Sequence, residues 1–381
     1  MNNRLLHTPE GVRDIYGKEY ARKLAVEQKL QKAIHCFGYE DIQTPSIEFF
    51  DVFSKEIGTT PSKELYKFFD KEGNTLVLRP DFTPSIARCA AKYFMEEKVP
   101  LRFSYNGNTF TNTSNLQGKL KEVTQMGAEL IGDPSVEADA EVISMVIEAL
   151  KSAGLTRFQV TIGEVDYFRG LCEEAGLDED TERELRSSIS GKNFFAAQEL
   201  LEQKQIPEPY HSILLKLADM FEDMESLESA KALAKNERSL QAIARLEKLK
   251  ERLEQYKVAE YISFDLGMLS KYQYYTGVVF NAYTYGIGDA VVKGGRYDNL
   301  LRKFGKDAAA IGFVIVIDDL LEALSRQKVD IALPASGRVL YYSIGDEADY
   351  QAKLAEAMKL RKEGIPTVLS PENKAAEEVR Q

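Results

Sequence analysis

Strand-like and helix-like segments alternate through most of this chain, but residues 171–256 contain helical patterns only. On both sides of that stretch, short runs of alternating apolar and polar residues predict strands. Strands that are so far apart in the sequence, with helices between them, favour an antiparallel sheet flanked by helices, an α+β arrangement. The sequence therefore predicts an α+β core, built from residues 1–170 and 257–330, that is interrupted by an all-α insertion at 171–256.

The individual elements follow from periodicity. Apolar residues at spacings of three and four predict helices at 16–37, 85–94 and 135–153, and within the insertion at 182–190, 194–203, 212–221 and 240–256. Strands are predicted at 41–48, 75–78, 101–110, 123–131, 158–162, 262–265, 278–283, 290–292 and 311–317. The run Asn106-Gly107-Asn108 predicts a turn at the end of its strand. After Pro334, a strand–helix–strand pattern predicts a small α/β C-terminal domain over 331–381.

Net charge restricts the classes of partner. The chain carries a formal charge of −11, and residues 171–256 contain 12 Lys+Arg against 19 Asp+Glu, a net charge of −7. Proteins that hold tRNA neutralise its phosphates with a basic surface. The acidic balance therefore argues against specific tRNA binding.

Metal, membrane and secretory signals are absent from the sequence. The three cysteines and three histidines lack the spacing of a zinc site, and no metal or cofactor is expected. Residues 1–9 lack the apolar run of a signal peptide, and no stretch approaches the ~20 apolar residues of a membrane span. We expect a cytoplasmic protein without membrane contact.

Four short motifs point to a binding site. They are Leu-Arg-Pro-Asp-Phe-Thr at 78–83, Thr-Gln-Met-Gly-Ala-Glu at 124–129, Tyr-Tyr-Thr-Gly at 274–277 and Gly-Gly-Arg-Tyr-Asp at 294–298. Each alone has an ordinary structural explanation, since a tyrosine pair is commonly sheet core and a glycine pair commonly a turn. In this order and spacing, however, they resemble the histidyl-tRNA synthetase family, whose members have the class II aminoacyl-tRNA synthetase fold.

The resemblance implies a pocket for a free amino acid. An ammonium group needs an acidic partner, and an imidazole needs polar groups that match its ring nitrogens. Positions that match the family's histidine pocket, and that we expect to bind histidine here, are Asp81, Thr83, Gln125, Glu129, Tyr274, Tyr275 and Arg296.

The catalytic arginines of the family have no counterpart. Activation of an amino acid by ATP develops negative charge that requires preorganised cations. At the three matching positions this sequence has Thr111, Ser270 and Asp319. The chain is therefore more similar to the non-catalytic branch of the family, the regulatory subunits of ATP phosphoribosyltransferase, and we expect it to have no catalytic residues of its own.

That branch implies particular partners. They are the short-form catalytic ATP phosphoribosyltransferase subunit, which performs the first step of histidine biosynthesis, and L-histidine as feedback effector. The resemblance also implies a homodimer within a hetero-oligomer, formed through residues 42–53, where Phe49, Phe50 and Phe53 offer apolar surface. An active histidyl-tRNA synthetase and a free-standing histidine sensor remain the alternatives.

Overall fold

The computed structural model describes residues 4–53, 60–113, 120–191, 193–217, 223–269, 274–333 and 337–372. The chain forms two compact units, Met1–Ile331 and Ala332–Gln381. Residues 171–256 belong to the first unit and do not form a compact unit of their own.

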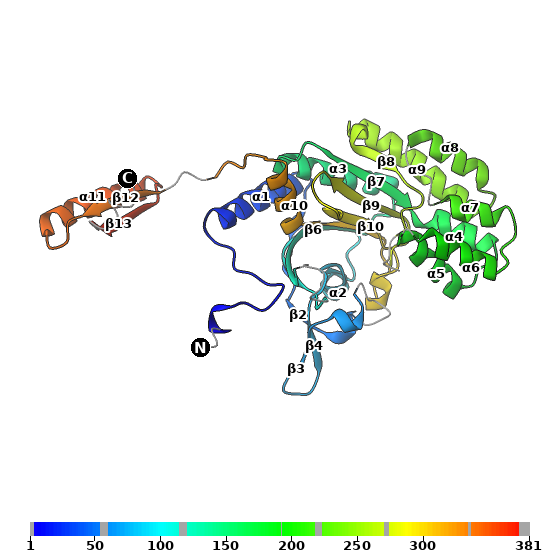
Figure 1. The fold of residues 1–381 in the computed structure, drawn as a ribbon, viewed down its shortest axis with the longest axis horizontal. Coiled ribbons are helices and arrows are strands. Elements are labelled where there is room, and N and C mark those ends of the chain that lie inside the picture. The colour runs from blue at the N-terminus through cyan, green and yellow to red at the C-terminus, as the bar shows by residue number, and fades with distance from the viewer. Residues whose placement is uncertain are drawn as a thin grey trace. The chain divides into compact units, whose positions relative to one another are not determined.

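A central eight-stranded sheet organises the first unit (Figure 1). In spatial order its strands are β1 (Glu40–Asp41), β5 (Leu101–Phe110), β6 (Glu122–Ile131), β11 (Ala310–Val316), β10 (Val292–Arg296), β9 (Val278–Thr284), β7 (Phe158–Glu164) and β8 (Ile262–Phe264). The two edge strands β1 and β8 pair in parallel with their neighbours, and all other pairs are antiparallel. The predicted antiparallel sheet flanked by helices is confirmed.

Helices cover both faces of this sheet. Figure 1 shows α1 (Gly17–His35), α3 (Val136–Ala153) and α10 (Ile317–Arg326) on one face, where they contact β5, β6 and β11. On the other face, α2 (Thr83–Tyr93) and the 3-10 helix η6 (Leu301–Phe304) join a buried cluster with Phe103 and Tyr105 of β5. The second face also holds the cavity described below, so α2 and the sheet form its walls.

In the described part of the chain between β7 and β8 there are six helices. They are α4 (Val165–Glu174), α5 (Glu179–Ser190), α6 (Phe194–Gln203), α7 (Tyr210–Lys216), α8 (Asp223–Leu233) and α9 (Glu237–Gln255). No strand lies among the described residues of this stretch, as the sequence predicts, although α4 and α8 have no counterpart among the predicted helices. Arg245 of α9 donates two hydrogen bonds to Asp139 of α3, which ties the helical stretch to the core.

A separate three-stranded sheet lies beside α2. It has the order β2 (Ile47–Phe49), β4 (Thr75–Leu78) and β3 (Lys67–Phe69). Phe53 was predicted to offer apolar surface, but it is 2% exposed and packs against Leu65 and Val77. Burial of the large Phe53 ring in the core stabilises the fold, whereas an exposed ring would not contribute in this way. Phe49, by contrast, is exposed.

Short 3-10 helices complete the first unit, namely η1 (Arg4–Leu6), η2 (Phe50–Phe53), η3 (Ser62–Glu64) and η5 (Ala259–Tyr261). The second unit is a strand–helix–strand motif, as predicted. Its strands β12 (Arg338–Tyr342) and β13 (Thr367–Pro371) pair in parallel, and α11 (Glu347–Lys362) connects them. Tyr342 packs edge-on against Tyr350 of that helix.

The turn predicted at Asn106-Gly107-Asn108 is wrong. These residues continue strand β5, and Gly107 pairs with Gln125 of β6. A Cβ at Gly107 would lie 2.7 Å from Nη2 of Arg79. The glycine therefore permits the Arg79 guanidinium to pack closely on the strand, which is a second reason for glycine inside a strand besides turn formation.

Candidate functional site

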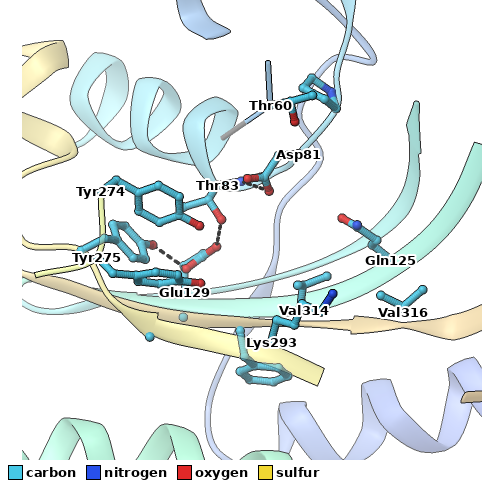
Figure 2. A pocket seen from close by; sticks show the side chains of 15 residues that line it. Thr60, Asp81, Thr83, Gln125, Glu129, Tyr274, Tyr275, Lys293, Val314 and Val316 are labelled. Carbon is cyan, nitrogen blue, oxygen red and sulfur yellow. Dashed lines mark hydrogen bonds between the residues drawn. The ribbon is translucent and has the colours of Figure 1, made fainter. Parts of the chain in front are cut away.

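A cavity of about 120 Å³ lies over the sheet next to the start of α2. Figure 2 shows Asp81 and Thr83 on one side of it, Tyr274 and Tyr275 beside them, and Glu129 and Gln125 on the sheet below. This volume is comparable to that of a cavity of about 150 Å³ that holds one small aromatic ring. It is well below the roughly 300–1,000 Å³ typical of drug-sized ligands, so the cavity suits a small molecule.

The floor of the cavity is one face of three neighbouring strands. Side chains alternate between the two faces of a strand, so Gln125 and Glu129 of β6 share a face. In the register, Glu129 is opposite Gly312 of β11, and Gly312 is opposite Gly295 of β10. All four residues line the cavity. The sheet therefore presents two polar side chains of β6 beside two glycines on the adjacent strands.

The glycines create the space that these side chains occupy. A Cβ at Gly312 would lie 1.6 Å from Oε2 of Glu129, and a Cβ at Gly295 would lie 2.7 Å from the Tyr275 ring. Real Cβ atoms do not approach other atoms so closely, and any larger residue would displace Glu129 or Tyr275. Glycine is thus required at both positions because side chains from neighbouring segments lie directly over the backbone.

Glu129 is the most deeply buried acid of the cavity, at 1% exposure. Thr83 donates a hydrogen bond of 2.8 Å to its Oε1, and the Tyr297 hydroxyl donates one to its Oε2. Burial raises the pKa of Glu129 from 4.5 to about 8, the two hydrogen bonds oppose that rise, and the negative charge of Asp81 adds to it. A cation bound in the cavity would stabilise the ionised form of the Glu129 carboxyl group.

Gln125 and Asp81 add further acceptors. The buried Oε1 of Gln125 has no hydrogen-bond partner among the described residues. Asp81 accepts a hydrogen bond of 3.2 Å from the backbone N–H of Thr83, at the start of α2. A buried acceptor without a partner costs free energy until a ligand or water supplies a donor. The cavity is consequently suited to a small ligand rich in N–H donors.

The structure places Arg296 outside this cavity. It follows Gly295 by one residue, so its side chain lies on the opposite face of β10. There its guanidinium donates to Asp139 of α3, and also to the backbone of Asp133 and Ser135. Arg296 is 2% exposed and Asp139 is fully buried. The expectation that Arg296 binds the ligand is corrected: its contacts hold β10 against α3.

Of the three positions at which the resemblance leads us to expect arginines, two lie within the described residues. Thr111 is half-buried just after β5, and Asp319 is in the first turn of α10. Burial, and next the nearby charge of Asp289, raise the pKa of Asp319. Asp319 lines a second, open cavity of about 1240 Å³ that shares Val316 with the first. The third position, Ser270, lies outside the described residues.

Several lining residues were not predicted as ligand contacts. Tyr297, which bonds Glu129, is part of the Gly-Gly-Arg-Tyr-Asp motif, and alternation from Gly295 places it on the cavity face. The same alternation identifies Lys293. Gly312 carried no local signal, since its role depends on a neighbour from β6. Among the described residues there is no cluster of three or more potential metal ligands, nor any helix long and apolar enough to cross a membrane.

Comparison with known proteins identifies the family. The sequence model of the histidyl-tRNA synthetase family matches residues 11–320. A protein of Acetivibrio thermocellus named ATP phosphoribosyltransferase regulatory subunit is 40% identical over 361 residues, covering 94% of this chain and 85% of the relative. One of Clostridium kluyveri with the same name is 36% identical, covering 96% and 93%.

Solved structures agree with the sequence comparisons. A Bacillus halodurans structure described as an ATP phosphoribosyltransferase regulatory subunit/histidyl-tRNA synthetase is 34% identical, with a TM-score of 0.88 over 99% of this chain and 96% of that one. Histidyl-tRNA synthetase of Nostoc is 18% identical and shares the fold, with a TM-score of 0.81 over 98% and 88% of the two chains. The chain therefore belongs to the ATP phosphoribosyltransferase regulatory subunits, a histidyl-tRNA synthetase-like family with the class II synthetase fold.

Proposed function

We propose that this chain is a non-catalytic regulatory subunit that binds free L-histidine in the cavity over the sheet. In this proposal it assembles with a catalytic ATP phosphoribosyltransferase subunit and makes that enzyme sensitive to histidine. The observation that carries the proposal is the acceptor set of the cavity, at positions that match the family's amino-acid pocket: the buried Glu129, the buried Oε1 of Gln125 and the half-buried Asp81. The names of the relatives support the regulatory role.

The acceptor set matches the donors of histidine. Glu129 and Asp81 suit the ammonium group, because a hydrogen bond to an ionised group is stronger than a neutral one. The phenol groups of Tyr274 and Tyr275, whose rings lie 4.5 Å apart, suit the imidazole side. The cavity of about 120 Å³ suits a ligand of the size of a single amino acid.

Amino-acid activation is disfavoured by the charges beside the cavity. An in-line attack on the ATP α-phosphate needs cations around the phosphates. Thr111 is neutral, and Asp319 places a carboxyl group where a triphosphate would need a guanidinium. A like-charge contact at ~4 Å costs on the order of 4 kcal/mol at an effective dielectric of about 20. The cavity thus supports binding without chemistry.

Regulation requires that histidine prefer one of two conformations of the assembly. If the ligand binds the inhibited conformation more tightly, it shifts the population toward that conformation. The catalytic subunit then loses activity without binding histidine itself. The cavity lies between α2 and the sheet, so ligand contacts made by Thr83 and Glu129 would act on two elements at once.

The test uses the catalytic subunit of the same organism, assayed with and without this chain. We expect histidine to inhibit only the assembled complex, and Asp81→Asn to raise the inhibitory concentration at least tenfold. The matched control is Asp180→Asn, at an exposed position of α5 that is remote from the cavity. Inhibition of the catalytic subunit alone, or histidine-dependent exchange of pyrophosphate into ATP by this chain, would contradict the proposal.

A further inference from the structure

The charged side chains of the cavity are unequal in number. Two of its lining side chains are acids, Asp81 and Glu129, and Gln125 adds an amide that can both accept and donate hydrogen bonds. A free amino acid is a zwitterion, and its carboxylate needs a cation or several N–H donors as partner. Of the described lining residues, only Lys293 carries a positive charge.

Lys293 lies on the cavity face at a suitable distance from Glu129. It is two residues before Gly295 on β10, and it is opposite Val314 of β11. Glu129 is two strands away and one side-chain row further along the sheet, because it is opposite Gly312, which is itself opposite Gly295. This corresponds to roughly 10 Å across the strands and roughly 7 Å along them.

Figure 2 shows Lys293 on the sheet at the side of the cavity where Val314 lies, with Glu129 under the tyrosines. A ligand of amino-acid size in this cavity would have an acid that suits its ammonium group at one end and a lysine that suits its carboxylate at the other. The two groups favour one orientation of the bound ligand, since the reverse orientation would place the ligand carboxylate beside Glu129 and the ligand ammonium beside Lys293.

The present partner of Lys293 is easily replaced. Its Nζ lies 3.2 Å from Oδ1 of Asp289, four residues earlier. The side chains of Lys293 and Asp289 are 36% and 56% exposed. An ion pair so accessible to water contributes little to stability. Lys293 can therefore exchange Asp289 for a ligand carboxylate at small cost.

The nearby guanidinium groups are committed elsewhere. Arg296 is held by Asp139 on the opposite face of the sheet. Arg79 is 5% exposed, donates to the backbone oxygens of Thr44 and Asn108, and stacks on the Phe82 ring. Neither arginine lines the cavity.

We infer that Lys293 binds the α-carboxylate of the amino acid in this cavity and makes the site selective for the free acid over derivatives that lack the carboxylate. The inference rests on the proposed function, since it takes the cavity as the histidine site. In this inference Lys293, on the glycine-rich strand β10, is a cation that determines specificity. It differs from the three positions at which the resemblance leads us to expect arginines.

Calorimetry on the full-length protein with L-histidine and L-histidinamide tests the inference. The amide keeps the imidazole and replaces the carboxylate with a neutral carboxamide, and measurement below the α-amino pKa of about 7.7–8.0 keeps its ammonium group charged. We expect the wild type to prefer histidine by roughly 10- to 100-fold, as for a charge-assisted hydrogen bond. Lys293→Met should lose that preference and bind the two ligands within about threefold, while Lys293→Arg should retain most of it.

The control is Lys151→Met, which removes another exposed lysine, paired with Glu148 on α3, and should leave the preference unchanged. Thermal unfolding of each variant verifies that the fold is intact, and Lys293→Gln replaces Lys293→Met if the latter unfolds. A preference that persists in the Lys293 variant, or is absent from the wild type, overturns the inference while histidine binding itself stands. Failure of the wild type to bind either ligand overturns the proposed function together with it.

Discussion

At the scale of single residues, the protonation state of Glu129 connects the cavity to pH. Its pKa of about 8 in the folded chain means that the carboxyl group is mostly protonated at neutral pH when no ligand is bound. A bound ammonium group favours the ionised form, so cation binding releases a proton. The effect of pH on folding is opposite to its effect on ligand binding. Because burial raises the pKa, Glu129 lowers the free energy of unfolding of the ligand-free chain as pH rises from 4.5 to 8.

We therefore expect Glu129→Gln to weaken histidine binding by roughly 10- to 100-fold at pH 8. The difference between wild type and variant should shrink by up to about tenfold between pH 8 and pH 7, since one pH unit corresponds to about 1.4 kcal/mol. Calorimetry of both proteins at several pH values measures this, and the ratio cancels the titration of histidine itself. Glu148→Gln, at an exposed acid of α3, is the control. A ratio that is independent of pH would show that Glu129 does not titrate on binding.

At the scale of elements, the strands position the site through close packing. Glu129, Gly312 and Gly295 are neighbours on β6, β11 and β10, and the two glycines leave room for the Glu129 carboxyl group and the Tyr275 ring. Arg296 and its buried partner Asp139 lie on the opposite face of the sheet. One strand, β10, thus carries the cavity floor on one side and a buried ion pair on the other.

Gly312→Ala is expected to destabilise the fold by about 1–3 kcal/mol, because the new methyl group would also lie 2.7 Å from the backbone oxygen of Ala128. It should weaken histidine binding at least tenfold by displacing Glu129. Chemical denaturation and calorimetry provide the two measurements. The matched control is Gly288→Ala, where a Cβ meets nothing within 4 Å. Unchanged binding in Gly312→Ala would mean that the Glu129 position does not matter for the ligand.

At the scale of the whole molecule, exposed apolar side chains on the small sheet are consistent with self-association. Ile47 and Phe49, on one face of β2, are 50% and 55% exposed. Adjacent apolar side chains on one small sheet are typical of an interface between proteins. The family resemblance assigns the surrounding segment 42–53 to a homodimer interface, and a twofold axis would place the same patch of both copies together.

We expect light scattering of the isolated protein to report at least a dimer at micromolar concentration. Phe49→Asp should shift it to the monomer, because burying an unpaired carboxylate in an interface is strongly unfavourable. Tyr285→Asp, which changes another exposed aromatic residue, should leave the dimer intact. A wild-type monomer, or a Phe49→Asp dimer of unchanged affinity, would exclude this surface as the interface.

Local patterns determined much of this protein. Apolar spacing predicted α1, α3 and α9, alternation predicted most strands of the sheet, and the absence of alternation over 171–256 predicted its helices. Six of the residues expected from the four motifs line one cavity, and that they bind histidine stays a prediction: Asp81, Thr83, Gln125, Glu129, Tyr274 and Tyr275. The helices and strands could be predicted because they depend on residues that are close in the sequence. The cavity residues could be predicted because the four motifs resemble those of a known family.

The tertiary structure decided which face of a strand each side chain occupies and what lies over it. Arg296 and Gly295 are adjacent in the sequence, but a strand turns successive side chains to opposite faces, so one belongs to a buried ion pair and the other to the cavity. The sequence around Gly107 predicts a turn, but the structure shows that the glycine makes room in strand β5 for the Arg79 side chain. Such contacts join residues far apart in the chain, and only the pairing of strands determines them.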